Sequence, residues 1–176
     1  VLLGQRISAA TPRRADLRWP MPVDLGQRLT GATITSLDRR AKYGLIHTDR
    51  DDTLIFHLGM SGRWRVDPEA LEKHDHFVLD TANHRRVTLY DPRRFGSLDI
   101  MPTVDLASYR AFVSMGPEPL GDAFTAQVLA AALSALLPAP SAGGLKALLA
   151  VTDAELRYRS RHARGLAPQP VAELVM

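Results

Sequence analysis

The heptapeptide Tyr90-Asp91-Pro92-Arg93-Arg94-Phe95-Gly96 separates two apolar stretches, Arg86–Tyr90 and Ser97–Ile100, that have the composition of β-strands. Pro92 fixes its own φ and disfavours a helical backbone at Asp91, so the pattern predicts a turn that joins two strands. This turn places two guanidinium groups beside an aromatic ring. One interpretation is a hairpin corner whose ring caps the edge of a sandwich while the arginines are solvated. The other is a contact with nucleic acid, because arginine reads base edges and phosphates and an aromatic ring can wedge between bases.

Short apolar stretches separated by turn signals continue on both sides of this corner, from Leu3 to Met101. The expected strands are Leu2–Ala10 and the stretches around Ile34–Leu37, Tyr43–Ile46, Leu54–Phe56, Trp64–Val66, His76–Leu79, Val87–Leu89 and Ser97–Ile100. A single helical turn is expected over Leu25–Leu29. Such a series is typical of an antiparallel sandwich. We therefore expect an α+β, mainly β fold with a two-layer antiparallel β-sandwich domain over residues 1–115.

The pattern becomes helical after Met101. Val104–Val113 has helical spacing, and residues 116–121 form a linker rich in Gly and Pro. Asp122 is the expected N-cap of a helix over Ala123–Leu137, and Lys146–Arg157 is a further candidate helix. The sequence thus predicts a second region, residues 116–176, made of a linker and helices.

Composition limits the function classes. A hydrophobic content of 45% with 23% charged residues is that of a globular protein. The sequence contains no Cys, which excludes disulfides, thiolate zinc sites and thiol nucleophiles. Lys and Arg exceed Asp and Glu by 22 to 19, a mild basic excess that is compatible with a polyanionic partner. No apolar run is long enough for a bilayer and no signal-peptide pattern is present, so a cytoplasmic protein without a membrane partner is expected. A monomer is also expected.

Arg39–Tyr43 begins one of the expected strands, with Arg40 and Lys42 on one face and Tyr43 on the other. The stretch suits either a charged strand end at the solvent rim or a Lys ammonium placed against a phosphate or a reacting sugar.

His57–Gly62 has glycines on both sides of Met60, which allow a sharp turn. Met60 is either buried at a bulge or carried outward as a flexible apolar finger that fills a gap in a base stack.

Lys73–His76 contains His74 and His76 two residues apart, so both lie on one face of a strand. A metal site is weakly supported because no third ligand is identifiable, and no metal is assigned. Contacts of the two histidines with backbone or water are the other interpretation.

These stretches occur together in the order and spacing of one family. With Asp16–Pro20 and Gly116–Leu120, they make the chain resemble the formamidopyrimidine-DNA glycosylases, bacterial enzymes that remove oxidised purines, over about Leu3–Ala150. Endonuclease VIII is related, but the Asp-Pro-Arg-Arg-Phe-Gly corner favours the purine-lesion branch. The resemblance implies a β-sandwich and a helical domain that hold damaged double-stranded DNA between them.

The resemblance also implies roles for individual residues. Met60 would fill the space left by an everted nucleotide, Phe95 would wedge beside it, and Arg93 would bind the orphaned base, with cytosine expected there. Lys42 would touch a phosphate and assist elimination as a catalytic proton donor. His74 would contact the DNA backbone, and Lys146 would lie near the lesion-binding cleft.

The sequence departs from the family pattern at three places. The family's nucleophile is the amine of an N-terminal Pro followed by Glu, whereas this chain begins at Val1, at a point that the family reaches after its first helix. A Gly-rich turn with a phosphate-binding Asn is missing after Leu149, so the helical region is expected to be shortened. The Cys-based zinc finger is also absent, so no cofactor is expected.

Three hypotheses therefore stand. The chain is a DNA-repair glycosylase and abasic-site lyase by family that has little or no activity as given, being an enzyme recorded without its N-terminus or a gene fragment of one. Alternatively, it is a non-catalytic remnant that binds damaged DNA. The third is a β-sandwich module that binds a protein partner and has no role on nucleic acid.

Overall fold

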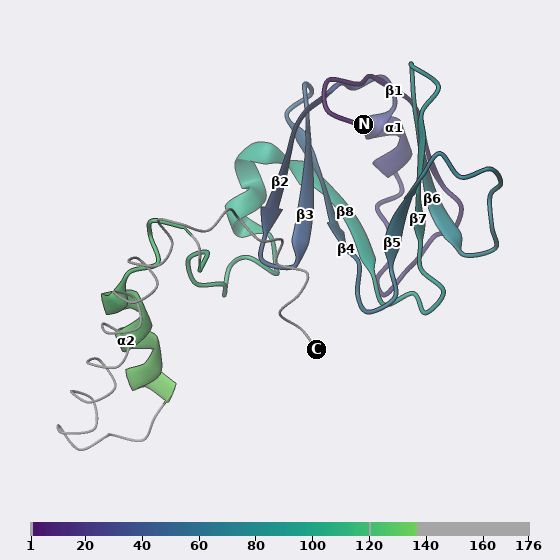
Figure 1. Ribbon diagram of the computed structural model, residues 1–176. Coiled ribbons are helices and arrows are strands. Elements are labelled where there is room, and N and C mark those ends of the chain that lie inside the picture. Colours follow the sequence, from purple (N-terminus) through teal and green to yellow (C-terminus); the bar gives the residue numbers. More distant parts are fainter. Residues whose placement is uncertain (1, 120, 137–176) are drawn as a thin grey trace, which may run out of the picture. The chain divides into compact units, whose positions relative to one another are not determined.

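The computed structural model describes residues 2–119 and 121–136. The chain divides after Gly116 into two units, and each is described by itself. The first unit contains nearly all the described elements (Figure 1): β1 (Ile7–Pro12), α1 (Leu25–Leu29), β2 (Ile34–Arg40), β3 (Tyr43–Thr48), β4 (Asp52–His57), β5 (Arg63–Val66), β6 (Asp75–Thr81), β7 (Arg86–Tyr90), β8 (Ser97–Pro102) and the 3-10 helix η1 (Thr103–Ser108). The second unit contributes α2 (Ala126–Leu136).

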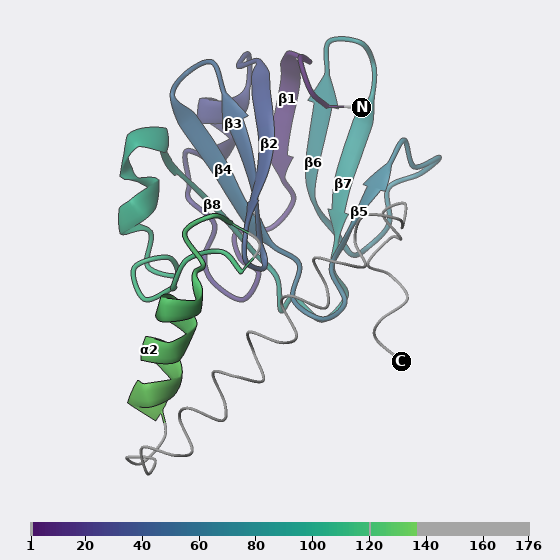
Figure 2. The ribbon, with the colours of Figure 1, turned by 60° about the vertical axis from the view of Figure 1, so that its left-hand side comes forward.

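The strands form two four-stranded sheets, with the orders β1-β6-β7-β5 and β2-β3-β4-β8. Every strand pairing is antiparallel. The two sheets face each other as the layers of a sandwich (Figures 1 and 2). The predicted α+β, mainly β fold with a two-layer antiparallel sandwich is confirmed.

The core lies between the sheets and takes side chains from both. Phe77, Leu79 and Leu89 come from one sheet and Leu54 and Leu98 from the other, each at most 2% exposed. Alternation along the strands points these side chains inward, and burying a large apolar side chain contributes about 1.5–3 kcal/mol.

The short helix α1 lies against β1 because of a glycine. A Cβ on Gly26 would stand 2.5 Å from the carbonyl oxygen of Ala10, so only a residue without a side chain allows this approach. Leu25 and Leu29, on either side of Gly26, are fully buried in the core. The predicted helical turn over Leu25–Leu29 is confirmed.

The outer face of the second sheet is covered by the chain after β8. Tyr109 and Phe112 are buried against Leu45 and Ile55, with Tyr43 packed edge-on to both rings. The predicted helix over Val104–Val113 is right only as far as Ser108, where η1 ends, because Tyr109 leaves the helical conformation with a ψ of 129°. The spacing of Leu106, Tyr109 and Phe112 instead reflects side chains that pack on the same sheet face, where the two aromatic rings are buried.

Two further expectations about element ends are corrected. β1 begins at Ile7 rather than Leu2, because Gly4 has a φ of +74° and the Gln5 N–H donates to the Leu2 carbonyl to close a turn. α2 begins at Ala126, and the Thr125 hydroxyl rather than Asp122 accepts a hydrogen bond from the Val128 N–H at 3.3 Å.

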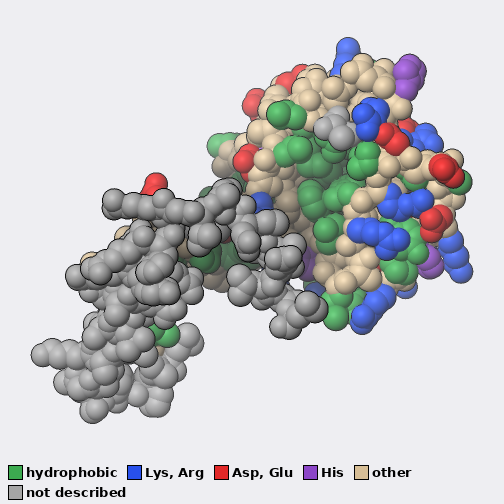
Figure 3. Space-filling view, in the orientation of Figure 1, with side chains coloured by type: hydrophobic (Ala, Val, Ile, Leu, Met, Phe, Trp, Pro, Cys, Tyr) green, Lys and Arg blue, Asp and Glu red, His purple; other side chains and the backbone are tan. Residues whose placement is uncertain are grey.

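One edge of the sandwich is open as an apolar groove of about 290 Å³ between the sheets, where hydrophobic side chains gather in Figure 3. Its lining residues are Leu2, Leu37, Asp38, Leu45, Ile46, Phe56, Trp64, Val66 and Val87. No helix of the described residues is long and apolar enough to cross a membrane.

Candidate nucleic-acid interface

The strand register brings the predicted site segments to one end of the sandwich. In one sheet Tyr43 pairs with His57, which pairs with Ser97, and in the other Arg63 and Asp75 both pair with Tyr90. The connections at this end are therefore residues 13–24, 41–42, 58–62 and 91–96, with His74 at the start of β6. Figures 1 and 2 both show the β4–β5 and β7–β8 connections together at the lower end.

A buried carboxylate fixes the corner after β7. Asp91 is fully buried, and its two carboxylate oxygens accept hydrogen bonds from the Ser61 hydroxyl and the Gly96 N–H, each at 2.8 Å. Its carbonyl oxygen accepts from the ring of His76 at 2.9 Å and from the Arg94 N–H at 3.2 Å. Asp91 thus ties the 58–62 loop, the 91–96 corner and β6 into one unit.

Sequence reasoning missed this role of Asp91. An Asp directly before Pro, with Gly five residues later at the end of the corner, is a signal that the turn is closed by a side-chain acceptor.

Met60 and Phe95 lie on adjacent loops and both are exposed. Met60 is 78% exposed, so the alternative of a buried Met60 is wrong. Gly59, with a φ of +65°, places its Cα against the Phe95 backbone, where an added Cβ would stand 2.7 Å from the Phe95 carbonyl carbon. The loop that carries Met60 therefore packs directly on the corner that carries Phe95.

Arg93 stacks on Phe95. Its guanidinium carbon lies 4.5 Å from the centroid of the Phe95 ring, which is 43% exposed. Both residues line a pocket of about 560 Å³ together with Asp16, Leu17, Arg18 and Arg94. Met60 does not line this pocket but stands on the loop beside it.

Lys42 lies in a tight turn rather than in a strand. The expected strand over Arg39–Tyr43 is wrong at its centre, because Arg40 pairs with Tyr43 and leaves Ala41 and Lys42 as a two-residue turn. Ala41 has a φ of +50°, an unusual conformation for a residue with a side chain. The turn leaves Lys42 exposed at the site end of the sandwich.

The pKa of His57, at the end of β4, is affected by the positive charges at this end of the sandwich. Burial lowers the pKa of His57 from its ordinary value, and the charges of Lys42 and Arg18 lower it further. Its ring packs at 5.1 Å from the Tyr43 ring. The positive charges of Lys42 and Arg18 near this partly buried imidazole favour an anionic ligand at this place.

His74 stands just before β6, with its ring 5.8 Å from Tyr90 and 6.0 Å from His76. The adjacent Asp75 is buried and accepts hydrogen bonds from the Glu72 N–H, the Thr88 hydroxyl and Arg65. Burial opposes ionisation of Asp75, but these donors outweigh it and lower its pKa. His74 is thus held on a fixed support, half-exposed.

Lys146 falls outside the described residues. Within the described ranges, no group of three or more His, Asp or Glu side chains is arranged to hold a metal ion.

The fold is similar to that of solved DNA glycosylases. Similar solved structures include the Lactococcus lactis FPG (MutM) protein with DNA that contains FAPY-dG, at a TM-score of 0.66 and 30% identity, covering 75% of this chain and 50% of that one. The same protein bound non-covalently to DNA with an AP site matches at a TM-score of 0.66 and 30% identity, covering 76% and 52%.

Sequence comparison gives the same class. The family model described as the formamidopyrimidine-DNA glycosylase N-terminal domain matches residues 1–98. The formamidopyrimidine-DNA glycosylase of Erythrobacter litoralis is 60% identical over 133 residues, which are 76% of this chain and 49% of the relative. That of Sphingopyxis alaskensis is 60% identical over 134 residues, which are 76% and 50%.

The chain belongs to the formamidopyrimidine-DNA glycosylase family, and the predicted resemblance is confirmed. The chain spans about half the length of the curated relatives that it matches.

Proposed function

We propose that the β-sandwich of this chain recognises damaged double-stranded DNA as part of the excision of oxidised purines, formamidopyrimidine and 8-oxoguanine. The supporting observation is that Met60, Arg93 and Phe95 are exposed at one end of the sandwich, on two loops joined through the Asp91 carboxylate. An exposed Met and an exposed Phe held by a buried hydrogen-bond network need a partner that removes them from water.

The three side chains suit a duplex from which one nucleotide has been everted. Extruding a nucleotide costs a few kcal/mol, and apolar groups that occupy the vacant space offset part of this cost. Met60 fills the space, and Phe95 wedges beside it. Arg93, already aligned by its stacking on Phe95, donates hydrogen bonds to the orphaned base, for which cytosine is the expected identity.

Lys42 and His74 complete the proposed contact. Lys42, in its exposed turn, holds a phosphate near the lesion and serves as the catalytic proton donor in elimination, and its charge already acts on His57. His74 contacts the DNA backbone from the start of β6. Lys146, outside the described residues, is proposed to lie near the lesion cleft.

A binding assay tests the recognition step. The polypeptide is titrated against a duplex with a stable abasic-site analogue opposite cytosine and against the same duplex undamaged. We expect tighter binding to the damaged duplex and loss of this preference in Met60→Ala and Phe95→Ala. Val104→Ala is the control, because Val104 is an exposed apolar residue on η1 that belongs to no site segment. Equal binding of both duplexes by the wild type would overturn the proposal. Absence of salt-dependent binding to either duplex would favour the protein-binding module.

A trapping assay tests catalysis. The family's amine nucleophile precedes a catalytic Glu, and the 176 residues contain no Pro-Glu pair at their beginning. We therefore propose that these residues alone bind the lesion without forming the imine. Borohydride reduction on 8-oxoguanine DNA is expected to yield no covalent complex. A trapped complex would instead show that the 176 residues form an imine with the lesion sugar.

A further inference from the structure

The loop between β1 and α1 is a rigid surface feature at the proposed site. Leu17 and Met21 anchor it in the core, each 5% exposed, and the Met21 N–H donates to the Ala15 carbonyl at 2.9 Å. The Arg18 N–H donates to the Gly96 carbonyl at 3.0 Å, which fixes the loop to the 91–96 corner. Arg18 and Trp19 thus project to solvent from a backbone that is held at three points.

Trp19 lies close to two arginines. Its ring is 48% exposed, and the guanidinium carbons of Arg18 and Arg110 lie 5.7 and 5.2 Å from its centroid. The other tryptophan, Trp64, is partly buried and packs against the core beside Phe56 and Phe77. A half-exposed Trp attracts both guanidinium groups by cation–π interaction, and Arg18 remains exposed to solvent.

The arginines around Trp19 carry excess positive charge. Among the residues that the structure describes, no carboxylate lies within ion-pair distance of Arg18, and Arg110 reaches Asp99 only at 3.8 Å. Asp16 is already shared by Arg14 at 3.1 Å and Arg94 at 3.7 Å. An anion placed here would find the guanidinium of Arg18, which no carboxylate of the described residues pairs, and that of Arg110, which Asp99 approaches only at 3.8 Å.

This cationic cluster is continuous with the proposed lesion contact. Arg18 lines the same 560 Å³ pocket as Arg93 and Phe95. In the proposed function, Arg93 faces the orphaned base, which belongs to the undamaged strand. A neighbouring nucleotide of that strand that lies across the pocket from Arg93 would meet Arg18, the residue before Trp19.

We propose that Arg18, Trp19 and Arg110 form a second DNA contact that binds the sugar–phosphate backbone of the undamaged strand beside the orphaned base. The inference rests on the proposed function. The guanidinium groups donate to phosphate oxygens, and the edge of Trp19 packs against deoxyribose. Contacts to phosphate and sugar carry no direct sequence information, so we expect the contact to be independent of sequence.

The test combines protein variants with a shortened DNA strand. One duplex carries an abasic-site analogue opposite cytosine with a complete undamaged strand. In two others the undamaged strand is interrupted by a gap on one side or the other of that cytosine. The wild type is expected to bind one gapped duplex roughly tenfold or more weakly than the complete duplex, because the gap removes the phosphates that the cluster holds.

The double variant Arg18→Ala/Arg110→Ala lacks the contact already. It is expected to bind the complete duplex roughly tenfold or more weakly than the wild type does, and the gap should not reduce its affinity further. The slope of log K against log salt is expected to fall by about two, one for each phosphate contact. Arg18→Lys retains a charge, so its salt slope should stay close to that of the wild type.

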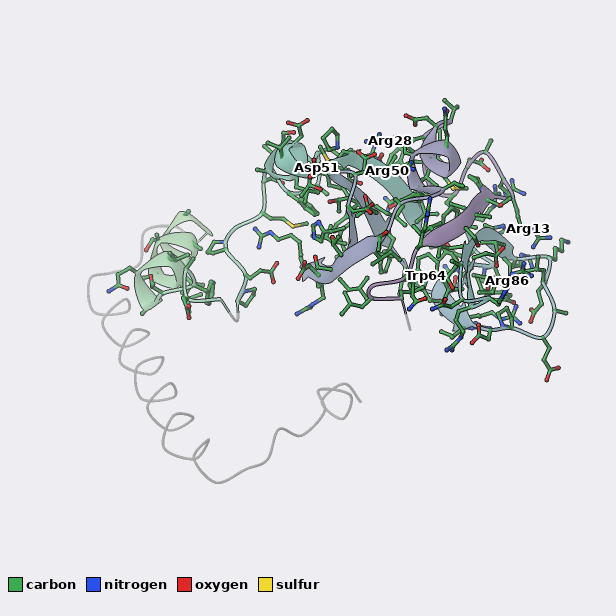
Figure 4. The ribbon with its side chains drawn as sticks, turned by 90° about the horizontal axis from the view of Figure 1, so that it is seen from above. Arg13, Arg28, Arg50, Asp51, Trp64 and Arg86 are labelled. Carbon is green, nitrogen blue, oxygen red and sulfur yellow. The ribbon has the colours of Figure 1, made fainter. Side chains whose placement is uncertain are left out.

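Arg50→Ala is the matched control, because Arg50 is an exposed arginine in the β3–β4 hairpin at the opposite end of the sheet, labelled in Figure 4. Its affinity and gap dependence should equal those of the wild type. An equal gap penalty in the wild type and the double variant would overturn the second contact while damaged-site preference persists. Loss of that preference in the wild type itself would overturn the proposed function and this inference together.

Discussion

Arg93 is the residue in which the chemistry of recognition is most concentrated. Its fork of N–H donors is aligned by stacking on Phe95, so little side-chain freedom remains to be lost on binding. We expect Arg93→Ala to reduce discrimination between cytosine and other bases opposite the lesion by about 1–3 kcal/mol. Competition between duplexes that differ only in that base measures the effect. An unchanged preference would contradict the role of Arg93.

His76 supplies a second prediction at the residue scale. Burial lowers its pKa below the ordinary 6.5, although the hydrogen bond to the Asp91 carbonyl opposes the shift. Below about pH 6.5 the unfolded chain therefore binds a proton that the folded chain does not, and the free energy of unfolding falls as the pH falls. His76→Gln keeps a donor for Asp91 but cannot titrate.

Urea titrations at about pH 7.5 and 5.5 measure this effect. The wild type should lose more stability between the two pH values than His76→Gln. His84→Gln, in an exposed turn, is the control and should behave as the wild type. An identical loss in the wild type and in His76→Gln would show that the imidazole charges without penalty.

At the scale of elements, the site depends on how closely the 58–62 loop approaches the 91–96 corner. In Gly59→Ala the new Cβ would stand 2.7 Å from the Phe95 carbonyl carbon at a φ of +65°. Gly4→Ala meets a similar φ of +74° with no atom within 4 Å. Gly4→Ala is therefore expected to lose about 1–2 kcal/mol of stability through backbone strain alone.

Gly59→Ala should lose more stability than Gly4→Ala, because one loop must move away from the other, and it should also weaken the preference for damaged DNA. Thermal unfolding and the abasic-duplex assay measure the two effects. Equal losses of stability with unchanged DNA preference would show that contact between the loops does not position the site.

The sequence predicts those elements whose ends carry local signals. The hairpins around residues 48–53 and 81–84 are found because turn residues lie between β-branched or aromatic runs. The helix predicted over Val104–Val113 extends too far. Its spacing reflects two rings, Tyr109 and Phe112, that pack on the second sheet, and periodicity alone cannot reveal that packing. The sequence also predicts a continuous strand through Lys42 and misses the two-residue turn there, because that turn needs an unusual φ at Ala41.

The site itself is partly readable from sequence. Met60, Arg93 and Phe95 are conspicuous because a solvated turn has no use for them. Asp91 and the Arg18–Trp19–Arg110 cluster depend on contacts between residues that are distant in the sequence. No local pattern reports such contacts, so they become visible only when the strands are in register.

At the scale of the whole molecule, three aromatic rings join the two sheets. Phe56 of β4 lies edge-on to Trp64 of β5 at 5.3 Å, and Trp64 lies 6.3 Å from Phe77 of β6 (Figure 4 labels Trp64). Because Phe77 is fully buried, Phe77→Ala removes packing from both layers at once. We expect it to lower the free energy of unfolding by about 3–5 kcal/mol.

If the sheets share one core, they must also unfold together. In a Trp19→Phe background, Trp64 fluorescence reports the space between the sheets, while far-UV circular dichroism reports the strands. The fluorescence and circular dichroism curves are expected to coincide in the protein with Phe77 and also in the Phe77→Ala variant. Both curves of the variant should be shifted to lower denaturant concentration. Val113→Ala, on an exposed turn, should change stability by less than about 0.5 kcal/mol. Separate transitions would mean that the sheets are independent units, and the site loops, which come from both, would then lack a common support.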